Sequence, residues 1–403
     1  MSALAPGSPA GRALPAPVPL WLLALFTFSG TLAMHIFVPA LPYAAEGLQA
    51  SVAATQLTIS LYIAGLALGQ LIYGPLSDHF GRRPTLMLGL GLYTLAGLAA
   101  ALAPDVHSLI AARLFQALGG CAGLVLGRTI VRDTALPEEA ARRLAMMNLM
   151  VTIGPGVAPL IGAAMAPALG WRSIFYALAA LGALNFVFSW RLLHETAPLR
   201  EGASADVRQL ARNYAGLCRS SAFLGYAIGG GCATTAMYAY IAAAPFIFVH
   251  RLHRPVQEVG LYLALLIAGI WLGSVAATRL VRRVDLQKLL VRGNGLSVAA
   301  ALALLAVVLL GQLSVPWVVG LMSLFTLGMG LASPAAMTQA LGVDPRITGS
   351  ASGLYGFAQM AVGALCSALV GLGRDPALAA ALVLVGAGLI GQIGFWIAAR
   401  RRA

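Results

Sequence analysis

Residues 74–83 read Gly74-Pro75-Leu76-Ser77-Asp78-His79-Phe80-Gly81-Arg82-Arg83, a short polar loop between two long apolar runs. Gly74 would let two helices approach closely at the edge of a membrane. Asp78 can accept a charge-assisted hydrogen bond, and Gly81 permits a tight reversal of the chain before the arginine pair. A loop that only sets topology needs the arginines alone. The combination therefore predicts a structured junction between two membrane helices.

The composition around this loop is that of a membrane protein. Of the 403 residues, 60% are hydrophobic and 10% are charged, whereas soluble chains are about 25% charged. A bilayer core of roughly 30 Å requires about 20 apolar residues per helix, and the chain contains twelve such runs. We expect an all-α polytopic membrane protein with 12 transmembrane helices, which excludes a soluble globular enzyme. The expected spans are residues 18–41, 53–76, 84–103, 107–131, 144–168, 173–194, 221–248, 258–280, 289–312, 316–340, 347–372 and 377–399.

The longest polar connection lies at the midpoint and divides the chain in two. Residues 195–220 form this linker, between predicted six-helix bundles at 18–194 and 221–399. The loop after the second span, GPLSDHFGRR, has a counterpart after the eighth, GSVAATRLVRR, with a glycine and an arginine pair at nearly the same spacing. Repeated halves around a central site are typical of secondary transporters. Residues 1–17 and 400–403 are expected to be cytoplasmic tails, the first of them disordered.

The positive charges predict an orientation. The net charge is +13, but Lys and Arg separate apolar runs instead of forming one basic face, so no nucleic-acid partner is expected. With a cytoplasmic N-terminus, twenty of the 26 Lys and Arg residues fall on the inner side, two fall inside the fourth span and four fall outside. This asymmetry predicts a multi-pass protein of the bacterial inner membrane with both termini cytoplasmic. The four outer residues are Arg172, Arg251, Arg254 and Arg374.

No cofactor or metal site is expected from the sequence. The four cysteines stand singly, without a C-x-x-C pair, and no carboxylate or cysteine adjoins the pair His250 and His253. The chain contains no nucleotide-binding glycine loop and no G-x-S-x-G motif. We expect neither ATP-driven pumping by this chain nor an intramembrane enzyme. The expected partners are a small-molecule substrate, protons and the lipid bilayer, and the chain is expected to be monomeric.

Two further spans contain residues that are unusual in an apolar helix. Arg113 lies in the fourth span, where a charge is costly, so we expect it to face a cavity. The alternative is that its side chain extends to the membrane interface. The fifth span includes Gly154-Pro155-Gly156-Val157-Ala158-Pro159-Leu160-Ile161-Gly162. Its prolines predict a bent helix, and its glycines predict close packing.

These three segments resemble signature motifs of the major facilitator superfamily. The 74–83 loop resembles motif A, a conformational latch whose acid would be Asp78. Arg113-Leu114-Phe115-Gln116-Ala117-Leu118-Gly119-Gly120 resembles motif B, R-x-x-Q-G, except that the glycine after Gln116 is displaced by two residues. Residues 154–162 are similar to motif C, which is associated with antiporters. The resemblance implies two six-helix bundles, proton coupling through Arg113, and export.

Four shorter stretches resemble the Bcr/CflA group of drug:proton antiporters within this superfamily, which includes bicyclomycin and chloramphenicol-type resistance exporters. The resemblance covers residues 18–399. It implies proton-driven export of drugs or other small amphipathic compounds, with the substrate bound between the halves near the midplane. The alternatives are export of a metabolite such as an amino acid, or uptake by a symporter of the same fold. The stretches are Val38-Pro39-Ala40-Leu41-Pro42, Val131-Arg132-Asp133, Gly170-Trp171-Arg172-Ser173-Ile174-Phe175 and residues 347–365.

One position departs from that group. Its members typically carry an acid four residues before the first proline of a P-x-L-P element, where this chain has His35, and none of the thirteen acidic residues falls mid-span. Because imidazole titrates near pH 6.5, we expect His35 to bind and release the coupled proton. The alternatives are a neutral His35 that hydrogen-bonds a neighbouring helix, or coupling through Arg113, Asp78 or Asp133. Without a carboxylate in the cavity, neutral or anionic substrates fit better than permanent cations.

Polar and aromatic side chains within the spans are candidates for the substrate cavity, because such cavities combine apolar walls with a few polar groups. Each of them can instead serve as a hydrogen-bonding residue between helices. The candidates are Tyr62, Gln116, Asn148, Tyr238 and Gln359.

Overall fold

The computed structural model describes residues 18–197, 207–281, 283–344 and 347–400. Every regular element within these ranges is helical. The elements up to the midpoint are α1 (Leu20–Ile36), η1 (Val38–Ala40), α2 (Leu41–Gly47), α3 (Val52–Phe80), α4 (Arg82–Ala101), α5 (Val106–Thr134), α6 (Pro137–Leu169), α7 (Arg172–Leu192) and α8 (Val207–Arg219). Those that follow are α9 (Ser221–Thr235), α10 (Met237–Phe246), η2 (Ile247–Arg251), α11 (Val256–Leu280), α12 (Leu286–Leu309), α13 (Val315–Leu341), α14 (Thr348–Gly371) and α15 (Pro376–Arg400).

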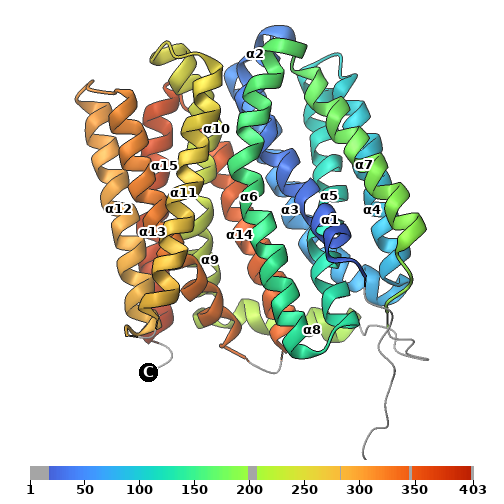
Figure 1. The fold of residues 1–403 in the computed structure, drawn as a ribbon. Helices are drawn as coiled ribbons and strands as arrows, with labels where there is room; N and C mark the ends of the chain where they lie inside the picture. Colours follow the sequence, from blue (N-terminus) through green and yellow to red (C-terminus); the bar gives the residue numbers. More distant parts are fainter. Residues whose placement is uncertain (1–17, 198–206, 282, 345–346, 401–403) are drawn as a thin grey trace, which may run out of the picture.

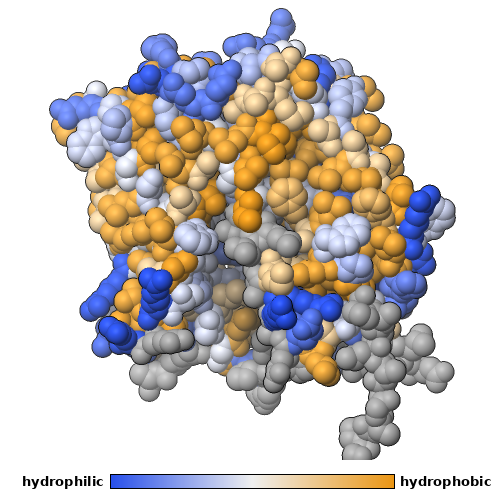
Figure 2. All heavy atoms as spheres, in the orientation of Figure 1, coloured by the Kyte–Doolittle hydropathy of each residue, from blue (hydrophilic) through white to orange (hydrophobic). Residues whose placement is uncertain are grey.

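The predicted all-α membrane class is confirmed. Within the described residues, eleven helices, or runs of consecutive helices, are long and apolar enough to cross a membrane. The remaining predicted span corresponds to α6, which is 33 residues long and includes the apolar stretch Ile153–Leu169. Figure 2 shows a broad apolar surface with hydrophilic residues gathered toward its two ends. Leu95, Leu309 and Trp190 are 61–68% exposed, as expected where lipid covers a protein.

The helices run side by side between two ends of the molecule, with α2 at one end and α8 at the other (Figure 1). We call these the α2 end and the α8 end. Helices α1 and α3–α7 pack against one another, and α9–α15 form a second group. The groups meet mainly where α3 packs on α14 and where α6 packs on α11, with smaller contacts of α10 on η1, α2 and α3 and of α11 on η1. Any movement of one group relative to the other must therefore change these contacts.

Helix α6 lies very close to both α1 and α11. A Cβ atom on Gly162 would overlap the carbonyl oxygen of Ile36 in α1. On the opposite side, a Cβ on Gly260 of α11 would lie 2.7 Å from the carbonyl oxygen of Pro159. The close packing that the glycines predict for this span is thus present at Gly162. The prolines inside α6 that interrupt its hydrogen-bond ladder are Pro155, Pro159 and Pro167.

Two predicted spans are not single helices. The first extends beyond its predicted end and is divided into α1, η1 and α2. It is divided because Pro39 and Pro42 lack the N–H that a continuous α-helix requires. The seventh divides into α9 and α10 at Ala236. Next to this break, Thr235 donates its hydroxyl to the carbonyl oxygen of Gly231 at 2.8 Å, a bond that bends helices.

The predicted linker, residues 195–220, includes the helix α8. Tyr214 and Leu217 are three residues apart and therefore lie on one face of it. Leu217 is 2% exposed, and Tyr214 packs against the same apolar cluster. Asn213 donates a hydrogen bond to Ser350 of α14 at 3.4 Å. This helix thus rests on the start of α14, which packs on α3 at the contact between the two groups.

Candidate functional site

His35 lies near the end of α1, at the contact between the two helix groups. The residue is buried, with 4% of its surface exposed. Its ring lines a cavity of about 10 Å³, which has room for about one water molecule. Pro155 and Pro159 of α6 line this cavity from one group, and Ile241 of α10 and Leu263 of α11 line it from the other. His35 is the only titratable residue among those that line the cavity.

Nδ1 of His35 makes a hydrogen bond, whereas Nε2 makes none among the described residues. Nδ1 lies 2.9 Å from the carbonyl oxygen of Thr31, one turn earlier in α1. Because a carbonyl oxygen only accepts, Nδ1 is the donor and carries the proton of the neutral ring. Nε2 then holds the lone pair that can take up a second proton.

The α6 side of this cavity offers a backbone acceptor. Pro159 has no N–H, so the carbonyl group of Pro155 loses the donor that it would have in a regular α-helix. The two prolines are four residues apart, on the same face of α6, and both line the cavity with His35. The proline pair therefore places an acceptor without its usual helical partner on the face of α6 that meets His35.

Tyr238 and Gln359, two of the predicted cavity residues, lie near the break in the seventh span. The rings of Tyr238 and His35 face each other across the two helix groups, with centroids 6.3 Å apart. Gln359 of α14 donates from Nε2 to the hydroxyl of Thr234 at 2.7 Å, and its backbone carbonyl, 2.7 Å from Oγ1 of Thr235, shares that hydroxyl with the carbonyl of Gly231. These bonds hold the end of α9 against α14 beside Tyr238.

Arg113 of α5 is fully buried among aromatic rings. Its guanidinium carbon lies 4.0 Å from the ring centroid of Tyr62 and 5.6 Å from those of Phe37 and Phe175. Nη1 donates to Oε1 of Gln116 at 2.8 Å, while Nε and Nη2 have no hydrogen-bond partner among the described residues. Aromatic faces stabilise a cation without neutralising it. The burial also disfavours the alternative in which Arg113 reaches the membrane interface.

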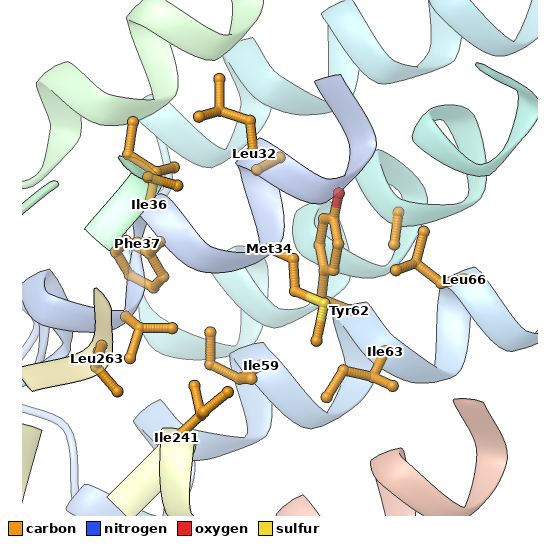
Figure 3. Packing of buried hydrophobic residues seen from close by; sticks show 14 of the residues in the cluster. Leu32, Met34, Ile36, Phe37, Ile59, Tyr62, Ile63, Leu66, Ile241 and Leu263 are labelled. Atoms are coloured by element: carbon orange, nitrogen blue, oxygen red, sulfur yellow. The ribbon is translucent and has the colours of Figure 1, made fainter. Parts of the chain in front are cut away.

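His35 and Arg113, the two candidate coupling residues, are connected through the residues at the end of α1. The ring of Phe37, two residues beyond His35, lies against Arg113. Figure 3 shows Phe37 and Tyr62 in one apolar cluster with Ile241 and Leu263, which belong to the other helix group. Tyr62 and Gln116 thus surround Arg113, whereas Tyr238 and Gln359 lie on the His35 side. The side chain of Asn148, the fifth predicted cavity residue, lies outside the described part of the chain.

The predicted loop, residues 74–83, is helical except at Gly81, and it forms an ion-pair network at the α8 end. Arg82 donates from Nη1 to Asp78, and from Nε to Asp133 at the end of α5 at 2.9 Å. Gly81 adopts a φ of 95°, in the region that favours glycine. Arg83 donates from Nη2 to the backbone carbonyl oxygen of Trp190 in α7 at 2.8 Å. Residues 74–83 therefore connect α3, α4, α5 and α7.

Glu195 caps the start of α4, a role that the sequence motifs do not identify. Its Oε1 accepts the backbone N–H of Arg82 at 2.9 Å, and its Oε2 accepts that of Arg83 at 3.2 Å. A carboxylate at a helix N-terminus satisfies unpaired N–H groups and interacts favourably with the helix dipole. The sequence contains one indication that such an acid is needed. Gly81 precedes α4 and has no side chain to cap it, so another residue has to supply the cap.

The close helix contact predicted at Gly74 is not found. No heavy atom of the described chain lies within 4 Å of the place where a Cβ of Gly74 would be. The close contacts of α3 with α5 occur earlier in the helix. A Cβ on Gly65 would lie 2.7 Å from the carbonyl oxygen of Leu114, and one on Gly69 would lie 2.5 Å from Cβ of Cys121. The prediction failed because Gly74 faces away from the α3–α5 interface.

The chain matches the sequence profile of the Major Facilitator Superfamily over residues 23–368. It belongs to this superfamily. It is 29% identical to the uncharacterized MFS-type transporter YdgK of Bacillus subtilis (strain 168), over 93% of this chain and 94% of that protein. It is 26% identical to the multidrug transporter MdfA of Escherichia coli O6:H1, over 84% of this chain and 83% of that protein. The bicyclomycin resistance protein homolog of Haemophilus influenzae is also 26% identical, over 88% and 89% of the two chains.

Solved transporter structures share the fold. A D-xylose-proton symporter superposes with a TM-score of 0.72 at 14% identity, over 94% of this chain and 96% of that one. The peptide transporter POT superposes with a TM-score of 0.75 at 16% identity, over 94% of each chain. The predicted superfamily is confirmed, and the bicyclomycin resistance relative supports the narrower group. Members of the superfamily are transporters, so this chain is a membrane transporter and not an enzyme.

Proposed function

We propose that this protein is a proton-coupled antiporter that exports drugs or other small amphipathic compounds across the bacterial inner membrane by alternating access. The observation that carries the proposal is His35, a buried titratable ring with a free Nε2 at the contact between the two helix groups. Relatives named as a multidrug transporter and as a bicyclomycin resistance protein homolog support the substrate class. The otherwise apolar lining of the cavity beside His35 favours neutral or anionic substrates over permanent cations.

The moving parts in this proposal are residues 18–194 and 221–399, connected by the linker 195–220. The excess of Lys and Arg on one side supports an orientation with the α8 end and both termini in the cytoplasm. The network of Asp78 and Arg82 would then act as a latch on the cytoplasmic side. We further propose that the protein works as a monomer and has no nucleic-acid partner.

Protonation changes what Nε2 of His35 requires. In the neutral ring Nε2 is an acceptor, and it can accept a hydrogen bond from a substrate on the side of Tyr238. In the charged ring both nitrogens are donors, and Nε2 needs an acceptor in a space that holds about one water molecule. The carbonyl of Pro155, deprived of its helical donor by Pro159, is available as that acceptor. Proton and substrate therefore compete for the same ring, which is the condition for antiport.

Arg113 supplies a fixed positive charge behind this site. It lies against Phe37, two residues from His35, and no described carboxylate neutralises it. Arg113 is therefore the second residue to which this proposal assigns a part in coupling. Each proton that moves inward contributes about 2.3 kcal/mol per 100 mV of membrane potential.

The test uses inverted membrane vesicles with an acid interior and a pH-gradient dye. A panel of drugs and amino acids is added to vesicles with the intact protein, with His35→Ala, or with His107→Ala. His107 is exposed at the start of α5 and serves as the matched control. Loss of the gradient on adding a drug, in the intact protein and His107→Ala but not in His35→Ala, is the expected result.

Two other outcomes have different meanings. Loss of the gradient in all three samples would retain antiport but assign coupling to Arg113, Asp78 or Asp133 instead of His35. A response to an amino acid and to no drug would contradict drug export and favour a metabolite exporter.

A further inference from the structure

A second cavity lies at the α2 end, away from the His35 site. Its volume is about 340 Å³, within the range of about 300–1,000 Å³ that is typical of small-molecule sites. Gln56 of α3 lines it from the first helix group. His250 and Arg251 of η2, and Arg374 and Asp375 before α15, line it from the second. The cavity therefore bridges the two groups that move in alternating access.

Positive charge gathers in this cavity on the side of the molecule where it is rare. Of the 26 Lys and Arg residues, four are expected outside, and two of these, Arg251 and Arg374, line this one cavity. Asp375 is the only carboxylate that lines it. The positive-inside rule does not account for two outer arginines in one cavity. A negatively charged ligand would account for their position there.

Asp375 does not neutralise both arginines. It accepts a hydrogen bond from Nη1 of Arg251 and from the backbone N–H groups of Ala377 and Leu378. Burial raises the pKa of Asp375, but the hydrogen bonds outweigh this effect and hold its pKa below the ordinary value. The carboxylate is thus ionised and already paired with Arg251. Within the described ranges, no carboxylate pairs with Arg374.

The cavity also has an apolar wall. Val52 and Ala53 of α3, which are half-buried, line it together with the buried Phe246 and Ile247 at the junction of α10 and η2. Beside them, Gln56 donates from Nε2 to the backbone carbonyl of Ala242 in α10 at 3.2 Å. This hydrogen bond joins the two helix groups, so the cavity is intact only while α3 and α10 are in contact.

We propose that this cavity binds a small amphipathic anion, a carboxylate with an apolar body. The head group pairs with Arg374, and the body lies on the apolar wall that includes Val52 and Ala53. Because the bound anion contacts both helix groups, it holds their α2 ends together and slows alternating access. The conclusion that the anion arrives from outside the cell depends on the orientation proposed above. The binding site itself does not depend on it.

Calorimetric titration of the purified full-length protein with 4-phenylbutanoate tests the site. The uncharged 4-phenylbutanamide is the matched ligand. Arg374→Ala should weaken binding of the anion at least tenfold. Arg254→Ala should leave binding unchanged, because Arg254 lies on the same side but pairs with Glu258 outside the cavity. His35→Ala should also bind normally, which separates this site from the central one.

Hydrogen–deuterium exchange tests the effect on conformation without any transport assay. With 4-phenylbutanoate bound, exchange should slow in residues 52–56 and 242–251. Equal binding of the amide, or undiminished binding by a folded Arg374→Ala protein, would overturn the site. Binding with unchanged exchange in both segments would overturn the closing effect. Either result can be read even if the protein proves to transport something other than drugs.

Discussion

The carboxylate of Glu195 accepts the backbone N–H of Arg82 at 2.9 Å, although 113 positions separate the two residues in the chain. The side chain of Arg82 in turn bridges Asp78 and Asp133. Glu195 therefore fixes the backbone of the residue at the centre of the ion-pair network. Through this contact the segment after α7 positions the start of α4.

Replacing Glu195 should destabilise this end of the molecule. Loss of a helix cap costs about 0.5–2 kcal/mol, so Glu195→Ala should unfold at a lower temperature than the intact protein in a fluorescence melting experiment. Glu195→Gln, which keeps one acceptor oxygen, should be intermediate. Glu46→Ala is the control, because Glu46 is exposed at the α2 end. Equal melting of Glu195→Ala and Glu46→Ala would show that the cap is unimportant.

The aromatic cage of Arg113 should not accept lysine. Lysine keeps the charge but lacks the planar group that lies over Tyr62 and bonds Gln116. We expect Arg113→Lys to reduce proton-coupled transport about tenfold or more, measured as the initial rate of gradient loss in inverted vesicles. Arg132→Lys is the matched control, since Arg132 is exposed in the last turn of the same helix. Transport at the normal rate by Arg113→Lys would mean that charge alone suffices.

Pro159→Ala should shift the pH dependence of transport. The new N–H at position 159 would occupy the carbonyl of Pro155 and remove the acceptor proposed for protonated His35. The protonated form then loses a hydrogen bond to a charged group, so the pH midpoint of transport should fall. Pro167→Ala removes a proline from an exposed position of the same helix, away from His35, and should leave the midpoint unchanged. A similar shift in both variants would point to helix bending instead.

Gly162→Ala should disturb the contact of α1 with α6. Its methyl group would overlap the carbonyl oxygen of Ile36, next to His35, and backbone cannot yield as a flexible side chain can. Overpacking of this kind typically costs about 1–3 kcal/mol, so the melting temperature should fall. Gly386→Ala adds the same methyl group at a helical position with nothing described within 4 Å. The prediction fails if the two variants melt alike.

Asp375→Asn should lower the melting temperature at neutral pH but not in acid. The folded-state pKa of Asp375 is below its ordinary value. The ion pair with Arg251 therefore stabilises the protein above the ordinary aspartate pKa of about 3.9, and this stabilisation is lost as the pH falls through the lower folded-state pKa. The pair is more than a third exposed, so the difference at pH 7 should be only about 0.2–1 kcal/mol. Melting curves of both proteins at pH 7 and in acid measure it, and a constant difference across this range would exclude the pair as its cause.

The membrane spans could be predicted because each depends on local composition. A helix in lipid satisfies its own backbone hydrogen bonds, so an uninterrupted apolar run of sufficient length is enough to specify it. The same reasoning identified His35 and Arg113 as unusual, since each is a titratable residue within an apolar run. It failed for the break at Ala236 and for the contact at Gly74, where neighbouring helices decide the outcome.

The sequence by itself determined the fold class, the membrane spans, the superfamily motifs and the positions of His35 and Arg113 within apolar runs. Only the tertiary structure decided which groups meet: Phe37, Tyr62 and Phe175 around Arg113, Pro155 beside His35, and Glu195 on the backbone of Arg82. The physical reason is that helix formation follows from contacts within about four residues. The environment of a buried side chain is instead set by lateral packing between helices that are far apart in the chain, which no local pattern specifies.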